Sequence, residues 1–299
     1  MSRFFVAGGG GMLGEGINRV LATRHDVMST DINLTSPWLS KLDFRDFDEY
    51  RRQVLDFRPD WIFHVGAHTS LEYCEEHEED AYRTNTIAVE YATRIANEAG
   101  IPIFYVSTAG IFDGKKPEYD DWDSPNPLGV YARSKYFGER FVVENAQRYI
   151  VCRAGWMMGG GRPKDKKFIN KLMLQMDGGA RELFVVNDKD GTPTYTHDFV
   201  RTVEVLVGKS AFGLYNCVCA GLTSRFEVAQ HLVGLLGRKD VRITPVASDY
   251  FSKEYFAARP PSERLVSKRL KMLGIGTMRD WRTALKDYLH EYYGIPDGD

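Results

Sequence analysis

The chain has 299 residues, 43% of them hydrophobic and 27% charged, a composition typical of a globular protein with one large domain or two closely packed ones. Its 39 lysines and arginines are balanced by 41 aspartates and glutamates, and the formal net charge of -2 argues against a nucleic-acid-binding protein. No apolar stretch approaches the ~20 residues of a membrane-spanning helix, and the N-terminal apolar run is too short for a signal peptide. We therefore expect a cytoplasmic protein with no membrane partner.

The cysteines and the acidic runs do not indicate a metal site. The cysteines lack the paired spacing of metal ligands, and a reducing cytoplasm fits them best: Cys74, Cys152, Cys217 and Cys219. The acidic runs at residues 72–80 and 118–123 are typical of solvated faces and loops. No metal is expected.

Strand-like and helix-like segments alternate along the first half of the chain. Strands are expected at residues 3–8, 26–30, 60–67, 101–109 and 149–155, with a further short strand ending near 41–44. Helices are expected at residues 12–24, 46–57 and 78–99, and a fourth carries Tyr131 and Lys135. This alternation predicts an α/β fold, a Rossmann-type doubly wound parallel sheet wrapped by helices.

The segments beyond Gly155 are less regularly spaced, which predicts a smaller C-terminal substrate domain. We place the dinucleotide-binding Rossmann domain at residues 1–158 and the substrate-binding domain at residues 159–299. Part of 185–220 is left open to return to the first domain.

A glycine motif directly follows the first expected strand. Gly8, Gly11 and Gly14 have G-x-x-G-x-x-G spacing, and Met12 and Leu13 open the next helix. Glycines let the backbone approach a pyrophosphate, whose charge is favoured at a helix N-terminus. The motif therefore predicts an NAD or NADP site.

Further cofactor contacts are expected at the ends of the next strands. Asp31 ends the second strand, where an acid hydrogen-bonds a ribose 2′-hydroxyl and slightly favours NAD over NADP, although Arg24 and Arg45 could compensate. Asp43 and Phe44 are placed to meet the adenine edge, with a simple turn as the competing interpretation of Asp43. The loop after the fourth strand adds Gly66, Ala67 and His68.

Three residues predict a carbonyl-reducing site. Tyr131 and Lys135 lie one helical turn apart, and Thr108 ends a strand of the same sheet. A nearby ammonium stabilises a phenolate, and a threonine hydroxyl can hold a substrate oxygen against the phenol while a nicotinamide delivers hydride. His64 and His68 are competing acid–base candidates, although His64 alternates with apolar residues as a core residue does.

These signals together resemble the extended short-chain dehydrogenase/reductase superfamily. The segments at residues 186–199, 152–159 and 258–289 narrow the resemblance to the dTDP-4-dehydrorhamnose reductase family. This resemblance covers essentially the whole chain. It implies NAD(P)H-dependent reduction of the 4-keto group of a nucleotide-linked 4-keto-6-deoxy sugar.

The resemblance also implies roles for individual residues. Thr108, Tyr131 and Lys135 match the catalytic trio, and Asn85 matches an asparagine that supports the lysine. The substrate side is implied at Thr69, Leu71, Thr108, Ala109, Gly110 and Trp156, with a core aromatic as the other interpretation of Trp156. Arg162, Lys164, Lys166 and Lys167 are candidates for the substrate diphosphate, or for a solvated basic loop.

One stretch departs from the family. The family commonly has Thr-Asp-Tyr where this chain has Thr108, Ala109 and Gly110, so two polar groups facing the sugar are missing and the sugar is left open. The change also argues against sugar 4,6-dehydratases and GDP-fucose synthases, whose proton carriers at these positions are absent.

Two other functions stay open. Residues 107–112 also resemble the small-residue version found in nucleotide-sugar 4-epimerases, which retain NAD and need no added reductant. The family further includes a non-catalytic regulatory subunit of methionine adenosyltransferase, although such a subunit has no need of Thr108, Tyr131 and Lys135. The nucleotide base, the product stereochemistry and a homodimer are also left open.

Overall fold

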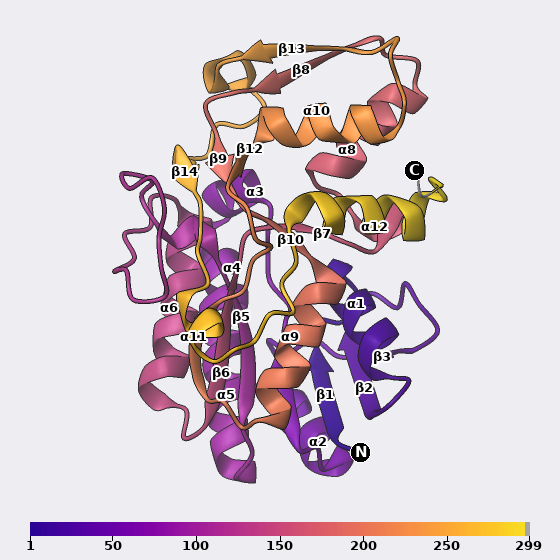
Figure 1. Ribbon diagram of the computed structural model, residues 1–299. Coiled ribbons are helices and arrows are strands. Elements are labelled where there is room, and N and C mark those ends of the chain that lie inside the picture. The colour runs from indigo at the N-terminus through magenta and orange to yellow at the C-terminus, as the bar shows by residue number, and fades with distance from the viewer. Residues whose placement is uncertain (297–299) are drawn as a thin grey trace.

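The computed structural model describes residues 1–296 and has a seven-stranded parallel sheet at its centre (Figure 1). The strand order is β11-β6-β5-β4-β1-β2-β3. The strands are β1 (Arg3–Ala7), β2 (Asp26–Asp31), β3 (Leu39–Lys41), β4 (Trp61–His64), β5 (Ile103–Thr108), β6 (Tyr149–Ala154) and β11 (Gly213–Asn216). This order, running outward in both directions from β1 and β4, confirms the predicted Rossmann-type fold.

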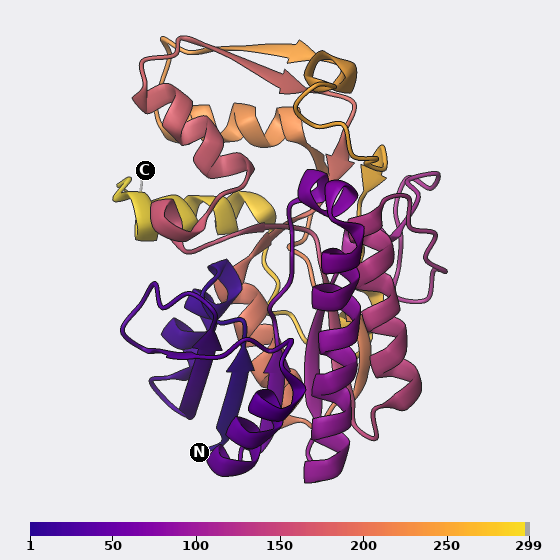
Figure 2. The same ribbon diagram turned by 180° about the vertical axis from the view of Figure 1, so that it is seen from behind.

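Helices cover both faces of the sheet. On one face, α1 (Met12–Leu21) and α9 (Thr196–Gly208) contribute Ile17 and Phe199 to an apolar cluster. On the other, shown in Figure 2, α2 (Phe47–Phe57), α5 (Ala88–Ala99) and α6 (Val130–Asn145) contribute Tyr50, Val89 and Val142 to a second cluster. Buried apolar surface on both faces is what gives the strands their nearly continuous hydrophobic sequences.

A smaller part of the molecule lies beyond the carboxyl ends of the strands, at the top of Figure 1. It contains α7 (Gly161–Lys164), α8 (Phe168–Asp177), α10 (Arg225–Leu235), η3 (Ser248–Phe251), α12 (Trp281–Tyr293) and the parallel pair β8 (Glu182–Val186) and β13 (Arg242–Val246). It has its own apolar cluster, which includes Leu183, Leu232 and Trp281.

Short ladders connect this part to the sheet. β7 (Trp156–Met158) pairs with β10 (Pro193–Tyr195), and β9 (Asp190–Gly191) lies between β12 (Thr223–Ser224) and β14 (Ser262–Glu263). The chain then returns to the first part, where β11 pairs with β6, and α11 (Lys268–Met272) contributes Leu270 to the cluster of α1 and α9. The domain boundary between residues 158 and 159 stays a prediction. The return at β11 falls within 185–220, the segment that the sequence analysis left open to rejoin the first domain.

Some elements differ from the sequence expectation. The helix expected at 78–99 is α4 (Glu78–Tyr82), a π-helical turn η1 (Arg83–Ile87) and α5, preceded by a separate α3 (Leu71–Glu76). A π turn inserts an extra residue into a helix and occurs often at functional sites. β3 ends at Lys41, so Asp43 lies in the following turn. Within residues 1–296, none of the helices is both long and apolar enough to cross a membrane.

Candidate active site

The candidate residues gather at the carboxyl ends of the central strands. The loops after β1, β2, β4 and β5 all emerge at this edge of the sheet, and the smaller part of the molecule lies over it (Figure 1). Open parallel α/β sheets bind their ligands at this edge.

The loop after β1 is held by close backbone packing. The N–H groups of Gly8 and Gly9 both donate to Thr30 O, at 2.9 and 2.8 Å, which ties the loop to β2. Gly8 has a φ of +85°, and a Cβ added to it would lie 2.1 Å from Gly66 Cα. Because the loops after β1 and β4 touch through their backbones, a side chain at Gly8 would force them apart.

The start of α1 presents free backbone donors. Gly11 is the N-cap residue, it makes no side-chain cap, and a Cβ added to it would have nothing within 4 Å. Met12 and Leu13 form the first turn, and Gly14 packs so closely that an added Cβ would lie 2.1 Å from Gly9 O. This open, uncapped helix start fits the pyrophosphate of a dinucleotide, because free N–H groups and the helix dipole favour an anion there.

Asp31 lies at the end of β2, as expected, and points toward the glycine loop. Its Oδ2 accepts from Gly10 N at 2.9 Å and its Oδ1 from Asn33 N at 2.9 Å. The two arginines considered as partners for a 2′-phosphate are engaged elsewhere, since Arg24 pairs with Glu204 and Arg45 with Asp43. The cation that does reach the loop is Lys164, whose Nζ donates to Gly10 O at 3.0 Å and to Thr35 Oγ1 at 2.6 Å.

A chain of charges links the next two loops. Arg45 donates to both carboxylate oxygens of Asp43 and to Asp80 Oδ1, and its hydrogen bonds hold the pKa of Asp43 below the usual value. His68 Nε2 lies 2.7 Å from the other oxygen of Asp80. Ala67 is half-buried beside His68, and Phe44 packs over Gly66, since a Cβ on Gly66 would lie 2.3 Å from its ring.

Thr108 and Tyr131 meet at the end of β5. Thr108 is the last residue of β5, its Oγ1 accepts from Gly110 N at 3.1 Å, and its side chain lies close to the ring of Tyr131. Burial raises the pKa of Tyr131 to about 12, the nearby Thr108 hydroxyl opposes this shift, and the charge of Glu263 adds to it. Tyr131 is therefore protonated at neutral pH and can donate a proton.

Lys135 is buried beneath this pair. It is 3% exposed, its Nζ donates to Val106 O at 2.8 Å, and it lies 4.2 Å from the centre of the Tyr105 ring. Burial lowers the pKa of Lys135 to about 7, and the charge of Glu139 only partly opposes this. His64 is fully buried in β4, and burial lowers its pKa to about 3, which suits a neutral core residue.

Asn85 occupies the π turn and is fully buried. Its Oδ1 accepts from His68 N at 2.8 Å, and its Nδ2 donates to His68 O at 3.0 Å and to Ser134 Oγ at 3.1 Å. These bonds join the loop after β4 to α6 next to Lys135. Asn85 reaches α6 through the hydroxyl of Ser134, the residue before Lys135, and its support of Lys135 stays a prediction.

Trp156 forms a wall on the side predicted to hold the substrate. The indole is half-buried and packs on Gly191, where an added Cβ would lie 2.2 Å from two ring atoms. Its Nε1 donates to Glu263 Oε2 at 2.8 Å, and the guanidinium carbon of Arg225 lies 3.7 Å from the ring centre. Burial lowers the pKa of Arg225 to about 10, so it remains a cation at neutral pH.

A basic cluster lies beside this wall. Lys167 Nζ donates to the carbonyl and hydroxyl oxygens of Thr69, at 2.9 and 3.1 Å. Burial lowers the pKa of Lys167, and the positive charges of Lys171, Arg225 and Arg259 lower it further. Several cations close enough to lower the pKa of Lys167 suit a polyanionic group such as a diphosphate.

The remaining substrate-side candidates are distributed unevenly. Ala109 and Gly110 are buried in the short turn η2 (Ala109–Ile111), directly after Thr108, and Leu71 is half-buried at the start of α3. Arg162 pairs with Asp177 within the smaller part of the molecule, and Lys166 is exposed. Lys164 contacts the glycine loop, whereas Lys167 contacts Thr69. The basic residues of 162–167 are therefore divided between the two ends of the site.

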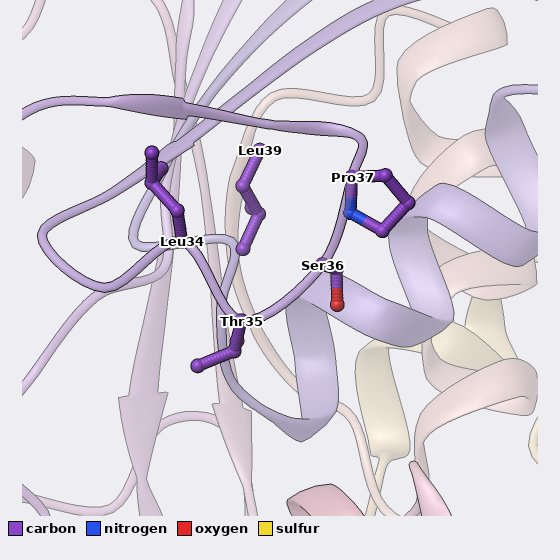
Figure 3. Close-up of a pocket in the computed structure, with 5 residues that line it drawn as sticks. All are labelled: Leu34, Thr35, Ser36, Pro37 and Leu39. Carbon is purple, nitrogen blue, oxygen red and sulfur yellow. The ribbon is translucent and has the colours of Figure 1, made fainter.

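A shallow hollow of about 400 Å³ lies next to the glycine loop, in the connection between β2 and β3 (Figure 3). Leu34, Thr35, Ser36, Pro37 and Leu39 line it. The residues that line it come shortly after Asp31 in the sequence, and one of them, Thr35, accepts a hydrogen bond from Lys164. The hollow therefore lies at the predicted dinucleotide end of the site.

Residues 2–293 match the family described as the RmlD substrate binding domain. The chain belongs to this family. A dTDP-4-dehydrorhamnose reductase of Mycolicibacterium smegmatis is 29% identical over 95% of this chain and 84% of the relative. The methionine adenosyltransferase 2 subunit beta of Danio rerio is 25% identical over 96% of this chain and 90% of that protein. The resemblance indicated by the motifs is thereby confirmed.

A solved structure of the same kind extends the comparison. The dTDP-4-dehydrorhamnose reductase of Bacillus anthracis, in complex with NADP, matches with a TM-score of 0.88 and 28% identity, covering 97% of this chain and 99% of that one. The fold of this RmlD-family chain is thus that of a reductase known to hold a dinucleotide.

Two side chains of this site, Glu263 and Arg225, were missed by the sequence reasoning. Neither belongs to a glycine motif, a tyrosine–lysine pair or a strand end of the central sheet. Glu263 lies in β14 and Arg225 at the start of α10, and only the β9–β12–β14 ladder brings them to Trp156. Glu263 is the one acidic residue in 258–265, and its presence there was the signal that the sequence offered.

Proposed function

We propose that this protein catalyses the NAD(P)H-dependent reduction of the 4-keto group of a nucleotide-linked 4-keto-6-deoxy sugar. The observation that carries the proposal is the arrangement at the edge of the sheet that also carries the glycine loop. Thr108 at the end of β5 lies close to Tyr131 on α6, and Lys135 is buried one turn along this helix. The family relatives named as dTDP-4-dehydrorhamnose reductases and the NADP complex support it.

The protein's own groups divide the work of the reaction. Thr108 positions the carbonyl oxygen through its hydroxyl, and Tyr131 donates the proton that the oxygen needs as the alcohol forms. Lys135, when protonated, stabilises the phenolate left on Tyr131. A bound reduced nicotinamide supplies the hydride to the carbonyl carbon.

The cations and the indole select the rest of the substrate. Lys167, Lys171, Arg225 and Arg259 form a positive region suited to the diphosphate, and Trp156, on which Arg225 stacks, borders this region. We place this activity in the cytoplasm, where nucleotide sugars and reduced nicotinamides occur together. A homodimer is a further part of the proposal that size-exclusion chromatography tests.

The experiment follows the loss of near-ultraviolet absorbance of NADH or NADPH when the protein is mixed with dTDP-4-keto-6-deoxyhexose. We expect turnover in the wild type, a loss of at least about 100-fold in Tyr131→Phe because the proton donor is removed, and nearly unchanged turnover in the matched variant Tyr136→Phe on the same helix.

Other outcomes assign the protein elsewhere. Interconversion of 4-epimeric nucleotide sugars without added reductant would favour the epimerase. Absence of turnover with dTDP-, GDP-, CDP- and UDP-linked 4-keto sugars would overturn the reductase and favour a binding role like that of the methionine adenosyltransferase subunit.

A further inference from the structure

Glu263 faces the catalytic pair from the smaller part of the molecule. β14 pairs in parallel with β9, with Glu263 opposite Gly191, and this register brings its carboxylate to Trp156. Its Oε1 lies 3.3 Å from the position that a Cβ on Gly110 would occupy. The same position is 3.5 Å from Thr108 Oγ1, so both oxygens lie close to Gly110.

The two carboxylate oxygens have different surroundings. Oε2 accepts the 2.8 Å hydrogen bond from Trp156 Nε1, whereas Oε1 has no hydrogen-bond donor among residues 1–296. The negative charge acts on the reaction centre, because it raises the pKa of Tyr131, and it acts on Arg225 across the indole. Glu263 is therefore a half-buried anion with one oxygen available to a ligand.

Gly110 and Glu263 fit one another sterically. A Cβ at position 110 would lie slightly closer to Oε1 than ordinary van der Waals contact allows, so a side chain there would require the carboxylate to shift by a few tenths of an ångström. The strand end at Thr108, Ala109 and Gly110 presents one side-chain hydroxyl and no charge. The acidic group facing the sugar comes instead from a segment far along the chain.

A carboxylate can only accept hydrogen bonds, so a ligand must offer it a donor. A keto oxygen or a phosphate would be repelled, whereas a sugar hydroxyl would bind. Of the two carbons beside C4 in a 4-keto-6-deoxyhexose, only C3 carries a hydroxyl. We propose that Glu263 determines substrate specificity by accepting a hydrogen bond from the C3 hydroxyl, which disfavours sugars that lack it; this rests on the proposed 4-ketoreductase function.

The test compares dTDP-4-keto-6-deoxyhexose with the 3-deoxy analogue. We expect Glu263→Ala to lower kcat/KM about 10- to 100-fold for the 3-hydroxy substrate and less than about 3-fold for the 3-deoxy one, because a hydrogen bond to a charged group is lost only in the first case. Glu263→Gln keeps an oxygen for Trp156 Nε1 and checks that the indole anchor is not the cause. Glu254→Gln, an exposed glutamate of the same part, is the matched control.

Equal losses for both sugars in Glu263→Ala and Glu263→Gln would overturn the proposal, since they would mean that Glu263 only anchors Trp156. A binding measurement separates this result from failure of the proposed function. Calorimetry on the NADP⁺-loaded wild type should show about 10-fold or tighter binding of a dTDP-6-deoxyhexose with a C3 hydroxyl than of its 3-deoxy counterpart. Equal affinities would overturn the role of Glu263, whereas absent turnover with preserved discrimination would overturn only the reductase.

Discussion

Lys135 shows how strongly one position can be shaped by its surroundings. Its ammonium is removed from water by the sheet and α6, and Val106 O and the Tyr105 ring compensate this burial only partly. The consequence is a lysine whose pKa falls to about 7 in the protein without ligands. Such a lysine changes its charge near neutral pH. The same ionisation therefore affects the stability of the fold and the fraction of molecules in which Lys135 carries its positive charge.

The depressed pKa of Lys135 predicts a pH dependence of stability. Between pH 7 and the ordinary lysine value, the unfolded chain binds a proton that the folded protein has lost, so the free energy of unfolding rises with pH by up to about 1.4 kcal/mol per pH unit. Below pH 7 both states hold the proton, and the destabilisation is fully present. Urea unfolding at several pH values measures this rise.

Lys135→Met is the control for this prediction. The variant should be more stable than the wild type at pH 6 to 7, and the difference between the two should shrink as the pH approaches 10. A difference that stays constant with pH would contradict the assignment of the shift to Lys135.

At the scale of elements, the site depends on the contact between α6, η1 and β5. Gly138 lies on α6 one turn beyond Lys135, where a Cβ would meet Asn85 O at 2.6 Å and Tyr105 Oη at 2.9 Å. Backbone on one side and a buried ring on the other leave no direction in which the contact can relax. This glycine therefore sets the distance between the helix that carries Tyr131 and the strand that carries Thr108.

Gly138→Ala should lower the free energy of unfolding by about 1 to 3 kcal/mol and should lower kcat, because α6 must move away from its neighbours. Thermal unfolding and steady-state kinetics measure the two effects. The matched variant Gly234→Ala in α10, where an added Cβ meets nothing within 4 Å, should instead gain up to about 1 kcal/mol from helix propensity. Equal behaviour of the two variants would argue against a packing role for Gly138.

At the scale of the whole molecule, contacts between the two parts surround the dinucleotide end. Tyr292 on α12 donates to Glu15 on α1 at 2.6 Å, and Lys164 on α7 reaches Gly10 and Thr35. The smaller part therefore contacts the glycine loop itself and does not only cover the substrate. Binding of the cofactor and the arrangement of the two parts are expected to depend on one another.

Lys164→Met should weaken NADPH binding about 3- to 10-fold, because a cation that contacts the loop around the pyrophosphate is lost. Fluorescence titration of the bound nicotinamide measures the change. Lys166→Met, in the same loop and exposed, should bind NADPH like the wild type. An unchanged affinity in Lys164→Met would show that this lysine only connects the two parts.

The local features of the site were predictable from the sequence. The strand, glycine turn and helix around Gly8, and the one-turn spacing of Tyr131 and Lys135, are set by residues close together in the chain, and the period of apolar residues predicts the elements that carry them. The fold class follows for the same reason. Helix and strand ends, such as the end of β3 before Asp43, were less well predicted because an apolar run does not show where pairing stops.

Only the tertiary structure decided which distant residues join the site. The π turn that aims Asn85 at His68 is one irregular turn inside a longer helical run, and the apolar pattern predicted the run without showing where this turn falls. Glu263 and Arg225 reach Trp156, and Lys164 reaches Gly10, through the pairing of short strands and the packing of the two parts. Sequence periodicity by itself therefore determined the elements and the one-turn spacing of Tyr131 and Lys135. Long-range packing, which depends on every surface that meets, decided that Glu263 lies beside them.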